Sequence, residues 1–117
     1  MARTSKAEHR TKERAATPLP TELDRLITEA TVDAYGEAEQ LVGFFTALED
    51  NLAVPFTTVL LGVAVTVVGV DLTDDDRIVA VCRRGKTRQR ISILDRPLPE
   101  PPPKGAEWIH ALRRWVG

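Results

Sequence analysis

The sequence predicts an α+β fold: an N-terminal helix or helix pair, a four-stranded antiparallel β-meander and a C-terminal helix. Three observations predict it. Apolar residues recur at helical spacing from residue 23 to residue 52. From residue 54 the apolar period changes to two and β-branched residues become frequent. Helical spacing returns only after the proline-rich connector 97–105.

The first helical run follows Pro18-Leu19-Pro20, with Thr21 as the expected N-cap and Asp24 as a first-turn acid. Gly36 separates it from a second run, so the chain forms either one bent helix or two helices. The apolar positions of the two runs are Leu23, Leu26, Ile27, Ala30 and Ala34, then Ala38, Leu41, Val42, Phe45, Leu48 and Leu52.

Residues 52–70 form an uncharged stretch of nineteen residues, long enough to be tested as a membrane span. Proline and glycines interrupt it and β-branched residues dominate it, so strands are expected instead of a membrane helix. The expected strands lie near 54–60, 63–70, 77–83 and 87–94, with turns at Leu61-Gly62 and Arg84-Gly85-Lys86.

The last helix is expected from Gly105 onward. One of its faces should dock on the body of the protein, through Trp108, Leu112, Trp115 and Val116.

Composition limits the class of protein. The chain has 117 residues, 43% of them hydrophobic and 28% charged, as in a soluble globular protein. A single cysteine excludes an intramolecular disulfide and favours a cytoplasmic location. Residues 1–17 are polar and predict a disordered basic arm without a secretory signal, and residues 18–117 predict one domain. Nothing requires a dimer, so a monomer is expected.

The net charge of −1 hides an asymmetry along the chain. Residues 22–76 carry twelve acidic side chains and one basic one, whereas the flanking segments 1–21 and 77–117 have net charges of +3 and +7. Such segregation indicates ions or charged partners.

The meander predicts where the carboxylates meet, because alternate turns of antiparallel strands lie at opposite ends of the sheet. One end receives the entry to the first strand, the turn at 72–75 and the exit of the fourth strand. Pairing about this turn places Asp71 near Asp76, and pairing about Gly85 places Asp76 near Asp95. The acidic residues expected at this rim are Glu49, Asp50, Asp71, Asp74, Asp75, Asp76 and Asp95, beside Asn51.

Carboxylates a few ångströms apart repel by roughly 1 kcal/mol per pair even in a water-like dielectric, so such a cluster raises its pKa values, stays solvated or binds a cation. Ca²⁺ fits best, since it takes roughly 6–8 oxygen ligands with loose geometry. Zinc does not fit, because His9, His110 and Cys82 are scattered. The spacing is not that of an EF-hand, and a solvated acidic turn remains the alternative.

A second acidic group, formed by Asp33, Glu37 and Glu39, lies at the start of the second helical run. It is either an exposed helix face or a second ion site.

A basic hairpin supports a rival function, namely binding of nucleic acid or of a protein. Its charges are Arg83, Arg84, Lys86, Arg88 and Arg90. The hairpin carries no aromatic residue for base stacking and the acidic block repels a polyanion, so nucleic acid is disfavoured. Charges that protect an edge strand are the simpler explanation. Catalysis is not expected: Cys82 alternates with core residues, and no nucleophile lies in a pattern with a base.

Four segments resemble the small bacterial calcium-binding proteins of the CcbP type. They are DAYGEAEQLVGFFTALEDNLAVPF (33–56), VTVVGVD (65–71), IVAVCRRGKTRQRISILD (78–95) and GAEWIHALRRW (105–115). The resemblance implies a compact α/β protein that binds Ca²⁺ through acidic side chains without an EF-hand, as a cytosolic buffer or sensor. The acids that match the family pattern are Asp33, Glu37, Glu39, Glu49, Asp50, Asp71, those of the Asp-rich turn, and Asp95. Gly36 stands where another acid is expected.

Overall fold

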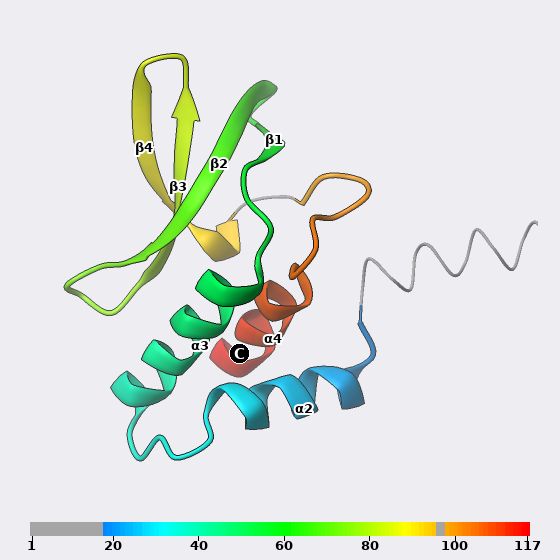
Figure 1. Ribbon diagram of the computed structural model, residues 1–117, viewed down its shortest axis with the longest axis vertical. Coiled ribbons are helices and arrows are strands. Elements are labelled where there is room, and N and C mark those ends of the chain that lie inside the picture. Colours follow the sequence, from blue (N-terminus) through cyan, green and yellow to red (C-terminus); the bar gives the residue numbers. More distant parts are fainter. Residues whose placement is uncertain (1–17, 96–97) are drawn as a thin grey trace, which may run out of the picture.

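The computed structural model describes residues 18–95 and 98–117 and confirms the predicted α+β class. The predicted arm 1–17 lies outside the described residues. Figure 1 shows the helices gathered at one end of the sheet, whose first and last hairpins extend away from them. The elements are, in order, α2 (Pro20–Ala30), α3 (Glu37–Asn51), β1 (Phe56–Leu60), β2 (Val63–Leu72), β3 (Ile78–Arg84), β4 (Thr87–Ser92), the 3₁₀ turn η1 (Ile93–Asp95) and α4 (Glu107–Val116).

The N-terminal half forms two helices. The chain turns between them with Asp33 at a φ of 61°, and Gly36 is the N-cap of α3. Gly43 lets α3 cross α2 closely, because a Cβ at this position would collide with the carbonyl oxygen of Ala30.

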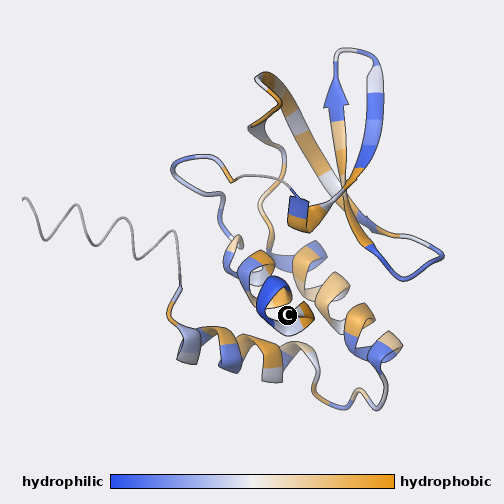
Figure 2. Cartoon of the chain, turned by 180° about the vertical axis from the view of Figure 1, so that it is seen from behind, coloured by the Kyte–Doolittle hydropathy of each residue, from blue (hydrophilic) through white to orange (hydrophobic). Residues whose placement is uncertain are grey.

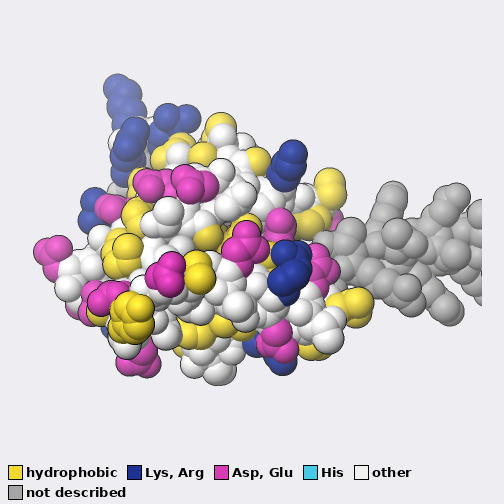
Figure 3. All heavy atoms as spheres, turned by 60° about the horizontal axis from the view of Figure 1, so that its bottom comes forward, with side chains coloured by type: hydrophobic (Ala, Val, Ile, Leu, Met, Phe, Trp, Pro, Cys, Tyr) yellow, Lys and Arg dark blue, Asp and Glu magenta, His cyan; other side chains and the backbone are white. Residues whose placement is uncertain are grey.

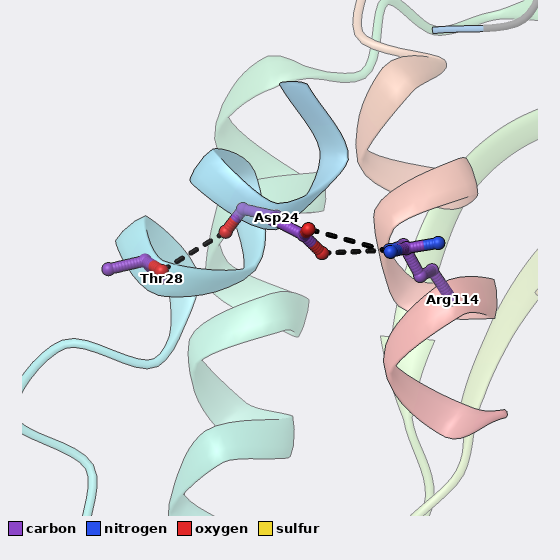
Figure 4. A network of polar contacts seen from close by, with 3 residues as sticks. All are labelled: Asp24, Thr28 and Arg114. Carbon is purple, nitrogen blue, oxygen red and sulfur yellow. Dashed lines mark hydrogen bonds and ion pairs between the residues drawn. The ribbon is translucent and has the colours of Figure 1, made fainter. Parts of the chain in front are cut away.

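The expected cap at Thr21 is wrong. Helix α2 begins at Pro20, and Leu19 precedes it without a side-chain cap. Proline at the first helical position has no N–H to satisfy and a φ already suited to the helix, so the helix starts two residues earlier than expected. Asp24 therefore lies beyond the first turn, and its Oδ1 instead accepts from Nε of Arg114 in α4 at 2.8 Å (Figure 4).

The sheet is the predicted antiparallel meander, with strand order β1-β2-β3-β4. Leu61 and Gly62 both have positive φ, as the turn of a tight hairpin requires. Gly85 also has a positive φ, in the turn between β3 and β4. Residues 52–70 form β1 and most of β2, as expected, instead of a membrane helix. No helix in the described part of the chain is long and apolar enough to cross a membrane.

The core lies where the helices meet one face of the sheet, and Figure 2 shows the hydrophobic sides of the helices turned toward one another. Phe44, absent from the predicted apolar positions, is 0% exposed, and its ring centroid lies 5.1 Å from that of Trp115. Trp108, Leu112 and Cys82 are buried as predicted. The expected packing of Val42 and Val116 is wrong, because both remain about half exposed on the outer sides of their helices.

Candidate metal centre

The strand order brings three acidic segments to one end of the sheet. The turn at 73–77 joins the end of β2 to the start of β3, and η1 leaves β4 at the same end and contacts β3. The C-terminal end of α3 approaches β2 shortly before this turn, since Glu49 shares a hollow of about 130 Å³ with Gly69 and Val70 of β2. The carboxylates predicted for the rim therefore come from neighbouring segments.

Residues 73–77 form a tight turn that presents three consecutive aspartates to solvent. Backbone N–H of Thr73 donates to the carbonyl of Arg77 at 2.9 Å, and N–H of Asp76 donates to the carbonyl of Thr73 at 3.1 Å. Asp76 has a φ of 61°, a left-handed conformation that aspartate tolerates better than most residues. The backbone closes on itself, so the side chains of Asp74, Asp75 and Asp76 are left pointing outward as exposed oxygen donors.

Asp75 is the most strongly organised carboxylate of this turn. The Thr73 hydroxyl accepts from the backbone N–H of Arg77 at 3.0 Å and donates to Oδ1 of Asp75. Nε of Arg77 lies 3.4 Å from the other carboxylate oxygen. These contacts, chiefly the hydroxyl hydrogen bond, hold the pKa of Asp75 below its ordinary value of 3.8. The carboxylate is therefore ionised at neutral pH and ready to attract a cation.

Asp71 lies on a strand instead of in the turn, and its expected pairing with Asp76 is wrong. It pairs with Val79, because the turn spans residues 73–77 where the expected turn was shorter. Oδ2 of Asp71 is 2.9 Å from Nη2 of Arg90, and Oδ1 accepts from the N–H of Leu72 at 2.9 Å. Its side chain is 40% exposed and therefore accessible to an ion. Such an ion would have to compete with Arg90 for the carboxylate.

Glu49 and Asp50 are exposed in the last turn of α3, where no basic side chain accompanies them. Carboxylates at a helix C-terminus meet the negative end of the helix dipole, which is electrostatically unfavourable without a cation. Asp50 also lines a hollow of about 370 Å³ together with Glu29 and the hydroxyl-bearing Thr46. Sequence reasoning missed Glu29, whose only signal was its (i, i+4) spacing from Arg25, with which it forms an ion pair at 3.5 Å.

Asp95 ends η1 and is exposed at the same end of the sheet.

Glu37 and Glu39 lie at the opposite end of α3 from Glu49. Twelve residues of helix separate Glu37 from Glu49, a rise of about 18 Å. One carboxylate oxygen of Glu39 accepts from the N–H of Tyr35 at 3.3 Å, which ties this acid to the loop before the helix. An ion bound here is therefore separate from one bound at the sheet end, and the two groups are distinct candidates.

The segments that carry the carboxylates lie near one another, but their carboxylate groups do not converge on one point where an ion could be held. Within residues 18–95 and 98–117, no three Asp, Glu, His or Cys side chains gather closely enough to hold a metal ion. Figure 3 shows Asp and Glu in separate groups across the face that contains the helices. The available donors are carboxylate, hydroxyl and backbone oxygens, a set that suits a hard cation such as Ca²⁺ and offers zinc no nitrogen or sulfur ligands.

Comparison with known proteins agrees with this donor set. A family model of the CcbP type, described as calcium binding, matches residues 24–94. The matched region runs from α2 into η1 and includes every predicted ligand except Asp95, which follows directly. No curated protein and no solved structure matches the chain.

Proposed function

Because the chain belongs to the CcbP family of calcium-binding proteins and its ion is Ca²⁺, we propose that it binds this ion at the sheet end, as a cytosolic buffer or sensor. The Asp-rich turn is the centre of the proposed site. The single observation that carries this placement is a closed turn that exposes three consecutive carboxylates. It joins β2, which the end of α3 approaches, to β3, which η1 contacts. The proposed ligands are Asp74, Asp75 and Asp76, with Glu49, Asp50, Asp71 and Asp95 as neighbouring donors.

Ca²⁺ coordination supports a site assembled from several segments. The ion takes roughly 6–8 oxygens at flexible geometry, more than one turn of three aspartates supplies without water or neighbours. The neighbouring acids are exposed or half-exposed, so their side chains can reorient without opening the core. Ion binding then relieves repulsion between the carboxylates it gathers.

The start of α3 is a second candidate location, with Glu37 and Glu39 near Asp33. Glu39 already accepts a backbone hydrogen bond, and Gly36 stands where the family pattern leads us to expect another acid. The sheet end offers more carboxylates from more segments, so it is the favoured location.

A buffer function is supported by the exposure of these acids. The elements that carry them pack in the core through apolar side chains, not through the carboxylates. Ion binding therefore does not require the helices to separate. A sensor would need an element with two arrangements that Ca²⁺ biases. Amide chemical shifts with and without Ca²⁺ distinguish the two, since a buffer changes only near the site.

Isothermal titration with Ca²⁺ and Mg²⁺ tests the proposed site. In one variant Asp74 and Asp75 are both replaced by Asn, in another Glu37 and Glu39 are both replaced by Gln, and Glu22→Gln is the control, an exposed acid outside both groups. We expect the first variant to bind Ca²⁺ at least about tenfold more weakly and the control to match the wild type. Loss of binding only in the second variant would move the site to the start of α3, and absence of Ca²⁺ binding in the wild type would refute the function.

A further inference from the structure

The two hairpin tips enclose a hollow at the end of the sheet opposite the Asp-rich turn. This hollow, the hairpin groove, has a volume of about 250 Å³. Its apolar floor consists of Leu60, Val63, Val65, Cys82 and Ile91, and Leu61, Arg83 and Arg84 stand at its rim. Because Val65 and Ile91 also pack against the core cluster, the groove continues the core-facing side of the sheet beyond the helices.

The hairpins on either side of the groove have opposite character. Figure 2 shows the β1–β2 hairpin hydrophobic to its tip and the β3–β4 hairpin hydrophilic at its tip. Residues 78–92 contain five basic side chains and no acidic one. Arg83 and Arg84 are exposed, and neither forms an ion pair with a carboxylate among the described residues. An apolar floor is therefore bordered by positive charge that no described acid neutralises.

Leu61 is placed against its local preferences. It is 95% exposed and has a φ of 51°, in a turn position where Asn, Asp or Gly is strongly preferred. A leucine in this left-handed conformation is strained, because its Cβ crowds the backbone. An exposed leucine in a strained position beside an apolar hollow indicates a contact made with another molecule.

We propose that the hairpin groove docks an acidic amphipathic segment of a protein partner. The groove is smaller than the pockets of about 300–1,000 Å³ that enclose small-molecule ligands, so it suits one anchoring side chain of a longer chain. Leu61 covers that apolar anchor, Arg84 pairs with a carboxylate beside it from the same face of β3 as Cys82, and Arg83 adds positive charge from the opposite face. Nucleic acid fits less well, because the groove has no aromatic residue for base stacking and most of its lining residues are apolar.

This inference goes beyond calcium binding and concerns different residues, so it stands or falls independently of the proposed ion site. Fluorescence polarisation tests it, with a labelled synthetic peptide in which Leu and Phe alternate with Glu. The control peptide has Lys in place of Glu. The key variant is Leu61→Asn, because Asn is favoured at this φ and should preserve or raise the melting temperature while it removes the contact. Arg84→Gln removes a rim charge, and Lys104→Gln is its control, an exposed cation outside the groove.

We expect the Glu peptide to bind and the Lys peptide not to bind. Leu61→Asn should weaken binding at least about tenfold, as truncation of a central anchor does, and Arg84→Gln should weaken it in a salt-dependent manner. Lys104→Gln should bind like the wild type.

Four results would overturn the inference. They are no binding of the Glu peptide, equal binding by Leu61→Asn, tighter binding of a labelled DNA duplex than of the peptide, and a wild-type dimer in light scattering that Leu61→Asn converts to monomer. The last would make a second copy of the chain the occupant.

Discussion

Arg90 is a basic residue whose charge acts on one of the acids of the proposed calcium site. It is the nearest described cation to Asp71, at 2.9 Å, and it reaches that carboxylate from β4 across β3. The ion pair neutralises the Asp71 carboxylate, so a Ca²⁺ ion at the proposed site would compete with the guanidinium for the same oxygens.

Arg90→Gln should therefore tighten Ca²⁺ binding. The gain is expected to be up to about fivefold, because exposed ion pairs contribute roughly 0–1 kcal/mol. Isothermal titration measures it, with Arg88→Gln as the control from the same strand. If the two variants gain affinity equally, the effect is long-range charge and Asp71 is not a ligand.

Thr73 controls the protonation of Asp75. Because hydrogen bonding lowers the folded-state pKa of Asp75 below 3.8, the carboxylate contributes stability that is present above this value and lost as the pH falls through the lower folded pKa. Thr73→Val removes the hydroxyl that donates to Asp75 and should raise its pKa toward the ordinary value. NMR titration of the Asp75 carboxyl carbon in both proteins measures this shift. An unchanged pKa in the variant would show that Arg77 or the backbone holds the carboxylate ionised instead.

At the scale of elements, the crossing of α2 and α3 depends on one missing side chain. Gly43 lies against the carbonyl of Ala30, at the C-terminal end of α2, where no Cβ fits. The two helices also meet α4, to which α2 is joined by the ion pair between Asp24 and Arg114. The hydrogen bond and the charge of Asp24 raise the pKa of Arg114, so the guanidinium stays charged at neutral pH.

Gly43→Ala should destabilise the protein by about 1–3 kcal/mol, because the backbone of α2 must move to admit the methyl group. Gly69→Ala is the matched control, since open space surrounds its Cβ position and its φ is not positive. That variant should be neutral or slightly stabilising, by about 0.4–1 kcal/mol. Urea unfolding of both proteins provides the comparison, and similar midpoints would mean that the helices cross less tightly than described.

The strands also show which features of the fold a sequence pattern can predict. The apolar period and the turn residues predicted the meander, its strand order and both tight turns. Side chains of a strand alternate between the two faces of the sheet, and a positive φ restricts which residues can form a turn. The length of the β2–β3 turn was not predictable, because any of several closures fits a run of aspartates. That difference moved Asp71 from the turn to the outer face of β2, beside Arg90.

At the scale of the whole molecule, the charges are segregated in space. The helices and the 73–77 turn carry most of the acidic side chains, and the tip of the β3–β4 hairpin carries a cluster of basic ones. Figure 3 shows the abundance of acidic side chains on the face that contains the helices. A cation is attracted to one end of the protein and an acidic partner to the other, which lets the two proposed interactions coexist.

Ca²⁺ should stabilise the native protein as a whole, because the proposed site combines acids from segments that are remote in sequence and near one another only in the folded state. Binding adds RT ln(1 + [L]/Kd), or about 2.7 kcal/mol at a free concentration one hundred times Kd. Thermal unfolding in EDTA and in millimolar Ca²⁺ measures the shift, and Mg²⁺ should give a smaller one because it requires stricter geometry. An identical melting temperature in all three conditions would contradict binding to the folded state.

The sequence by itself determined the fold class, the strand order, the donor chemistry and the resemblance to calcium-binding proteins. These follow from periodicity, from turn residues and from the hardness of carboxylate oxygens, all of which are local or compositional properties. Only the tertiary structure decided that Arg90 forms an ion pair with Asp71 and that Gly43 of α3 lies against Ala30 of α2. The same is true of the apolar groove between the two hairpin tips. These features depend on distances between segments remote in sequence, and packing alone fixes such distances.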